Sequence, residues 1–356
     1  MAYTTIKKPS DYFNTITYTG DGSSSRSLTG VNFQPDFIWG KSRSAVRNHH
    51  LFDSVRGGNK LIKSNSTDAE TVDAGSGDIG SFDSDGFTAI SGSSDNNNFN
   101  NNSENYVAWN WLGANGTSAN TDGDIASTVS ANTTSGFSIV SYTGNSTSGA
   151  TVGHGLGVTP KMVIVKKRSA SGFNWVVQHA SIFNSSDTIV ALDSADAAYT
   201  QGVANFNGTA AGSSVFTIGS GGNTNDTGAS YIAYCFADKQ GFSKFGSYTG
   251  NGSTDGTFVY TGFKPAFVMI KKTDSAGNFW HIYDTKRSSS GGSNIIDDVL
   301  YPNRSDAEYS GDKLDIVSNG IKFRSGNGDI NSSGGNYIYM AFAEQPLVGD
   351  NPATAR

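Results

Sequence analysis

The stretch Tyr106-Val-Ala-Trp-Asn-Trp111 returns twice in the chain, as Tyr231-Ile-Ala-Tyr-Cys-Phe236 and as Tyr337-Ile-Tyr-Met-Ala-Phe342. Its density of β-branched and aromatic residues favours a strand. Each copy follows a proline that opens another apolar run, and the distance from that proline to the tyrosine is 71, 71 and 72 positions. The three prolines are Pro35, Pro160 and Pro265. This constant spacing predicts that three segments of the chain share one backbone.

A second mark, the tripeptide Tyr-Thr-Gly, precedes each proline and begins at Tyr18, Tyr142 and Tyr248. Glycine permits a tight turn, and proline suits a strand entrance because it lacks a ladder donor. We therefore expect the turns and the prolines to occupy equivalent places.

The composition predicts an all-β fold. The chain has 356 residues with 44 glycines, 12% aromatic and 16% charged residues, and no apolar pattern at helical spacing extends over three turns. Short apolar runs separated by Gly, Asn and Ser are typical of sandwiches and jelly rolls. We expect three tandem homologous β-sandwich or jelly-roll-like units with a short N-terminal arm. The expected segments are an arm (1–14), a first unit (15–112), a polar linker (113–136), a second unit (137–237), and a third unit with a C-terminal tail (238–356). The linker predicts that the first unit sits apart from the other two.

Charge and cysteine content exclude several classes. The net charge is −6, and the longest run of Lys and Arg is the three residues 166–168, so we expect no nucleic-acid partner. The single cysteine, Cys235, cannot form an intrachain disulfide and is predicted to be a buried thiol. No apolar segment approaches the length of a membrane helix, and residues 1–9 lack the apolar core of a signal peptide. This combination fits a virion protein released by lysis.

The opening Met-Ala-Tyr-Thr-Thr-Ile-Lys-Lys-Pro-Ser-Asp-Tyr-Phe13, with Gly30-Val-Asn-Phe-Gln-Pro-Asp-Phe-Ile-Trp39 and Leu51-Phe-Asp-Ser-Val-Arg-Gly57, resembles a family of tandem-repeat proteins of tailed phages of aquatic bacteria. The resemblance covers nearly the whole chain and is weakest in the second unit. It implies a virion structural protein, tail-fibre-like or on the capsid surface, and it brings no catalytic residues with it.

Carboxylate pairs are the expected signature of glycan cleavage. The candidates are Asp83 with Asp85, which lie in a turn sequence, and Asp53 with Asp284, each three residues before an arginine. One charge pair at equivalent places suggests structure, so we expect no catalytic residues and no enzyme activity. The five histidines lack zinc spacing, and the acidic stretches at 78–85 and 95–104 lack a regular calcium loop, so we expect no metal and no cofactor.

Exposed aromatic side chains can stack on sugars. Trp109 and Trp111 recur as aromatic positions in every copy, which favours core packing. Trp175 and Trp280 align with each other beside a loop and are the candidate glycan contacts.

The N-terminal arm is the candidate docking element for another virion protein. Its anchors are predicted to be Tyr3, Ile6, Lys7, Lys8, Tyr12 and Phe13. Apolar side chains would bury in the partner and the lysines would meet acidic groups. The alternative is that the arm adds an edge strand to its own first unit.

Together these observations predict a phage tail-fibre or adhesin-like component that contacts the host surface. A capsid-surface decoration protein and a carbohydrate-binding or depolymerising protein are the alternatives. The expected partners are other virion proteins, further copies of the chain in a homo-oligomer and a host surface glycan, with no membrane partner.

Overall fold

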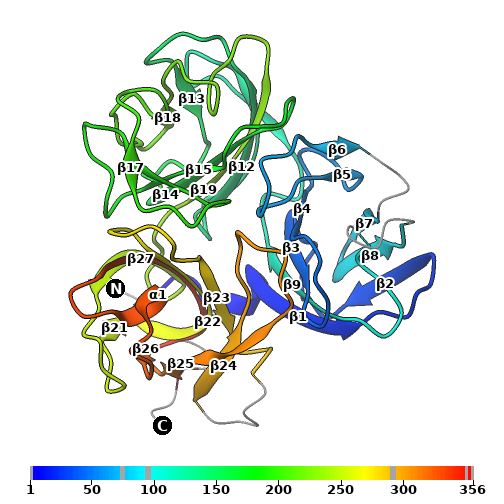
Figure 1. The fold of residues 1–356 in the computed structure, drawn as a ribbon. Coiled ribbons are helices and arrows are strands. Elements are labelled where there is room, and N and C mark those ends of the chain that lie inside the picture. The colour runs from blue at the N-terminus through cyan, green and yellow to red at the C-terminus, as the bar shows by residue number, and fades with distance from the viewer. Residues whose placement is uncertain (1–2, 73–76, 93–97, 289–293, 349–351, 354–356) are drawn as a thin grey trace.

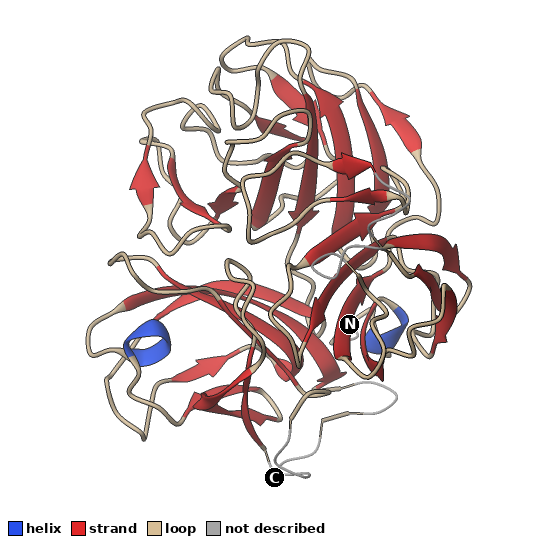
Figure 2. Cartoon of the chain, turned by 45° about the vertical axis from the view of Figure 1, so that its right-hand side comes forward, coloured by secondary structure: helices blue, strands red, loops and turns tan. Residues whose placement is uncertain are grey.

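The computed structural model describes residues 3–72, 77–92, 98–288, 294–348 and 352–353. Nearly all regular structure in these ranges is antiparallel β (Figure 2). The helical elements are the single turns η1 (Pro9–Asp11) and α1 (Gly328–Asn331). The prediction of an all-β fold is confirmed.

We refer to three parts of the chain by their strands. The first part contains β1 (Phe13–Thr19), β2 (Ser25–Thr29), β3 (Phe37–Ser42), β4 (His50–Asp53), β5 (Lys60–Leu61), β6 (Thr71–Val72), β7 (Asp78–Asp83), β8 (Gly86–Ile90) and β9 (Asn105–Trp111). The second part contains β10 (Ser118–Asn120), β11 (Ser127–Asn132), β12 (Phe137–Thr143), β13 (Thr151–Gly153), β14 (Met162–Lys167), β15 (Val176–His179), β16 (Thr188–Ala191), β17 (Tyr199–Thr200), β18 (Val215–Thr217) and β19 (Ser230–Phe236). The third part contains β20 (Ser243–Thr249), β21 (Phe258–Tyr260), β22 (Phe263–Lys272), β23 (His281–Asp284), β24 (Ile295–Val299), β25 (Tyr309–Val317), β26 (Gly320–Phe323) and β27 (Asn336–Pro346).

One strand order occurs in all three parts. It is β1-β9-β3-β4 in the first, β12-β19-β14-β15 within the larger sheet of the second, and β20-β27-β22-β23 in the third. The register also agrees, because Trp111 pairs with Phe37, Phe236 with Met162, and Phe342 with Phe267. Each of these partners lies two residues after one of the three prolines.

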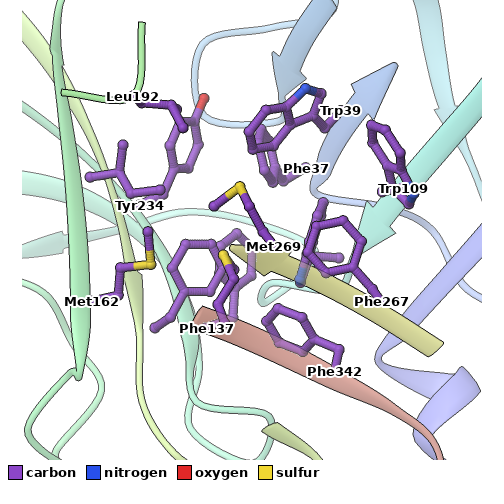
Figure 3. Packing of buried hydrophobic residues seen from close by; sticks show 14 of the residues in the cluster. Phe37, Trp39, Trp109, Phe137, Met162, Leu192, Tyr234, Phe267, Met269 and Phe342 are labelled. Carbon is purple, nitrogen blue, oxygen red and sulfur yellow. The ribbon is translucent and has the colours of Figure 1, made fainter. Parts of the chain in front are cut away.

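The inner faces of these three sheets share a single aromatic core (Figure 3). The Phe37 ring stacks on Tyr234 of the second part at 4.3 Å between centroids, and Phe13 stacks on Phe342 of the third part at 5.0 Å. Figure 1 shows the parts arranged around this common centre. The first part therefore does not sit apart, because its largest apolar side chains are buried against the other two.

The opposite faces have separate apolar cores, each covered by a small outer sheet. These outer sheets are β2-β8-β7, β13-β18 and β21-β26-β25-β24. Each part is therefore a two-layer arrangement whose inner layer faces the molecular centre.

The segment predicted to be a loose linker, 113–136, contains β10 and β11, which continue the sheet from β12. It is also fastened to the first part, because Asp36 Oδ2 accepts hydrogen bonds from the backbone N–H groups of Gly113 (2.8 Å) and Asn115 (3.0 Å). The prediction of a loose linker rested on polar composition and was wrong, because β10 and β11 form their backbone hydrogen bonds at the edge of the sheet.

Candidate functional site

A buried chain of charges joins the first part to the second. The Asp53 carboxylate accepts from Arg56 Nε at 2.5 Å and from the Tyr234 hydroxyl at 2.7 Å. Arg56 also pairs with Glu70 at 3.1 Å, and Glu70 pairs with Arg168 of the second part at 2.7 Å. Each ion in this chain therefore has a partner of opposite charge, as buried charges require.

The same arrangement joins the third part to the first. The Asp284 carboxylate accepts from Arg287 Nε at 2.5 Å and from the Trp109 indole Nε1 at 2.9 Å. Glu308 pairs with Arg287 and with Arg43 of the first part, both at 2.7 Å.

The junction between the second and third parts uses other residues at the matching positions. His179 occupies the same position in the strand pairing as Asp53 and Asp284. It pairs with Met162, as Asp53 pairs with Phe37 and Asp284 with Phe267. Its Nε2 lies 3.2 Å from the carbonyl oxygen of Tyr339 in the third part. Burial lowers the pKa of His179 to about 4, so the imidazole is neutral at pH 7.

The guanidinium groups of Arg56 and Arg168 keep Glu70 ionised. Burial raises the pKa of Glu70, but the hydrogen bonds and the positive charges of Arg168 and Arg56 lower it by more. The net pKa of Glu70 therefore lies below its ordinary value. Asp53 and Asp284 are fully buried. Both acids that the sequence offered as a catalytic pair are thus enclosed in structural ion pairs in different parts of the molecule.

The second acid pair supports a turn. Asp85 accepts backbone N–H groups of Gly30 (3.2 Å) and Asn32 (2.6 Å), while Asp83 accepts the hydroxyls of Ser81 and Thr88. Over the described ranges, no group of three or more His, Cys, Asp or Glu side chains is placed to hold a metal ion. Residues 95–97 of the second acidic stretch lie outside those ranges.

The candidate glycan contacts Trp175 and Trp280 are 0% and 1% exposed, which corrects the prediction. Their indole Nε1 atoms donate to the carbonyl oxygens of Lys63 (2.9 Å) and Ala191 (2.8 Å), each in the preceding part. A buried indole offers no face to a sugar. The equivalent sequence positions of the two tryptophans reflect packing, since each side chain binds its own part to the preceding one.

The N-terminal arm packs against its own chain. Ile6 and Phe13 belong to the shared core, and Tyr12 lies against it, with its ring 6.0 Å from Phe242 of the third part. The Tyr3 hydroxyl donates to Gly262 O at 2.7 Å. Of the six predicted docking residues, only Phe13 lies in a strand, at the start of β1.

Ile6 and Phe13 are therefore buried within the molecule and unavailable to a partner, whereas Tyr3 and Tyr12 are half-buried. Lys7 and Lys8 are exposed, and Lys8 pairs with Asp11 at 2.7 Å.

Buried lysines at three matching positions were not anticipated. Lys41, Lys166 and Lys271 occupy matching positions, paired with Val107, Ile232 and Ile338. Each ammonium donates to a carbonyl oxygen, that of Ser42, Phe173 and Asn278, respectively. Burial lowers the pKa of Lys41 to about 7 and those of Lys166 and Lys271 to about 8. The signal in the sequence was a lysine at the end of each post-proline strand.

Cys235 is a buried free thiol whose pKa is raised by burial to about 12. Neither helical element in the described ranges has the length and hydrophobicity that crossing a membrane requires.

The fold and these junctions define an all-β protein in which several antiparallel sheets are fastened around one aromatic core. A family model described as a domain of unknown function (DUF7483) matches residues 8–346, and the chain belongs to this family. No curated protein matches the sequence significantly.

Proposed function

We propose that this protein is a non-catalytic structural component of a phage virion, in a tail-fibre or adhesin-like position that contacts the host surface. The observation that carries the proposal is the use of buried ion pairs as fasteners between parts. The acids considered for catalysis, Asp53 and Asp284, are enclosed with Arg56 and Arg287. A molecule held together in this way suits a mechanical and adhesive role.

We further propose that the three parts are homologous β-sandwich units, related by an approximate threefold arrangement. The support is that equivalent residues bind in cyclic order. His49, Trp175 and Trp280 directly precede the corresponding strands β4, β15 and β23. Their ring nitrogens reach the carbonyl oxygens of Tyr301, Lys63 and Ala191, respectively. Each unit thus contacts the preceding one, and the ring closes within one chain.

A capsid-surface decoration protein is the second candidate. The closed arrangement of Figure 1 favours it, since the parts surround a centre rather than forming a string. In either position the predicted partners are other virion proteins. Association with further copies of this chain also stays a prediction, which sedimentation velocity would test.

Immunogold labelling of purified particles, with antibodies raised against the whole protein, tests the proposal. We expect label at the tail, and label over the capsid would favour decoration instead. Antibodies pre-absorbed with the purified protein are the control. Absence of the chain from purified particles, by labelling and by mass spectrometry, would contradict both positions.

A further inference from the structure

The outward face of β21 carries two exposed aromatic side chains. Phe258 is 46% exposed and Tyr260 is 57% exposed, while Val259 between them points into the core of the third part. Residues two apart on a strand share a face and are separated by about 7 Å. Two rings therefore lie side by side on the surface.

The N-terminal arm adds a third ring. The Tyr3 hydroxyl donates to Gly262 O, and burial together with Tyr260 raises the pKa of Tyr3. A Cβ atom built on Gly262 would lie 3.1 Å from the Tyr3 hydroxyl and 3.6 Å from that of Tyr260. Both hydroxyls therefore converge above this glycine. We call Tyr3, Phe258 and Tyr260 the β21 patch.

The fold does not require aromatic residues at these positions. In the first part the corresponding strand is β2, where Leu28 pairs with Phe87 as Val259 pairs with Ile321. The outward residues of β2 are Ser27 and Thr29, and both are exposed. The corresponding strand of the second part, β13, has Thr151 and Gly153. The aromatic pair is thus specific to the third part, which points to binding rather than to folding.

The rim of the β21 patch supplies polar groups without a net charge. Lys322, directly across from Phe258, pairs with Asp255 at 2.7 Å, and Arg324 pairs with Asp315 at 2.7 Å. Two positive and two negative groups balance, which disfavours a nucleic acid or an anionic lipid surface. The same groups can donate to and accept from hydroxyls.

We propose that the β21 patch binds a sugar residue of a neutral surface glycan. A pyranose presents an apolar C–H face, which fits an aromatic ring, and a hydroxyl edge, which fits the polar rim. The two rings expose together about 200 Å², whereas a stable protein interface buries about 800 Å² per partner. The patch is therefore of small-ligand size. This inference deepens the proposed attachment function, on which the choice of a surface glycan rests.

Affinity electrophoresis of the purified full-length protein in gels containing dextran, laminarin or xylan tests the proposal. We expect at least one of these neutral polysaccharides to retard the wild-type protein. The double variant Phe258→Ser/Tyr260→Thr carries the residues of β2, and we expect it to lose at least tenfold in affinity. Tyr309→Thr is the matched control, because Tyr309 is 52% exposed at the far end of β25. Circular dichroism and thermal melting verify that both variants fold.

Equal retardation of the double variant, or none of the wild type in any gel, would overturn the inference. Retention by vesicles of neutral or anionic phospholipid that requires Phe258 and Tyr260 would also contradict it, since a membrane surface would then be the ligand. The result is separable from the proposed virion role. Glycan binding by a protein that labelling does not find on particles would leave the β21 patch standing and remove the virion role.

Discussion

The indole Nε1 of Trp109 donates to the carboxylate of Asp284 at 2.9 Å, across 175 positions of sequence. The bond joins the first part to the third, and the Tyr234–Asp53 bond repeats it between the second part and the first. A polar contact inside an aromatic core is sensitive to loss of one partner, because the other stays buried.

Replacing Trp109 by Phe should lower the free energy of unfolding more than the same change at Trp111. Both indoles are buried on β9, but Trp111 Nε1 has no hydrogen-bond partner among the described residues. The difference between the variants isolates the bond to Asp284, and we expect about 1–3 kcal/mol. Urea denaturation measures it. Equal losses for the two variants would mean that the bond does not contribute.

Arg56→Ile should destabilise the protein by about 3–5 kcal/mol, because it leaves the buried carboxylate of Asp53 without its cation. The second part has no such ion pairs at these positions, where His179, Ile182 and Ala198 stand in place of Asp53, Arg56 and Glu70. The triple variant Asp53→His/Arg56→Ile/Glu70→Ala copies that set of residues.

We expect this triple variant to be more stable than the single variant by about 1 kcal/mol or more, since no unpaired buried acid remains. Urea denaturation of both proteins decides. A triple variant less stable than Arg56→Ile would show that the junctions are not interchangeable.

Lys166→Met should stabilise the protein at pH 7 by about 1–3 kcal/mol, because a desolvated ammonium is replaced by an apolar side chain. The folded-state pKa of Lys166, about 8, lies below its ordinary value of 10.5. Between these values the unfolded state binds more protons, so stability of the wild type should rise with pH from about 8 to 10.5. The Lys166→Met variant should lack the part of this rise in stability that comes from Lys166.

Lys161→Met is the control for this experiment, because Lys161 is exposed just before β14. Chemical denaturation at pH 7, 8.5 and 9.5 gives the slopes. Identical slopes for wild type and Lys166→Met would contradict the assignment.

His179→Gln should flatten the acid side of the stability profile. Burial lowers the pKa of His179 from 6.5 to about 4, so the unfolded state binds the proton first as the pH falls. Stability contributed by the neutral imidazole is therefore present above pH 6.5 and is lost progressively toward pH 4, by about 2–3 kcal/mol. Glutamine keeps a donor for Tyr339 O without a titration. Denaturation at pH 7 and pH 4.5 measures the change, and an unaltered pH dependence would contradict it.

The sequence by itself determined the all-β class and the places of the repeated marks. Pro35, Pro160 and Pro265 each precede by two residues a residue that pairs with Trp111, Phe236 or Phe342. Such marks are local, because turn geometry and strand propensity depend on a few neighbouring residues.

Only the tertiary structure decided which aromatic side chains are covered. Trp175 and Trp280 lie beside loops, as predicted, but carbonyl groups of the preceding part receive their indoles. Phe258 and Tyr260 have nothing in their local sequence to distinguish them, yet both of their rings are exposed. Burial depends on which distant segments pack against a residue, and three sheets closing on one core bring together segments more than a hundred residues apart.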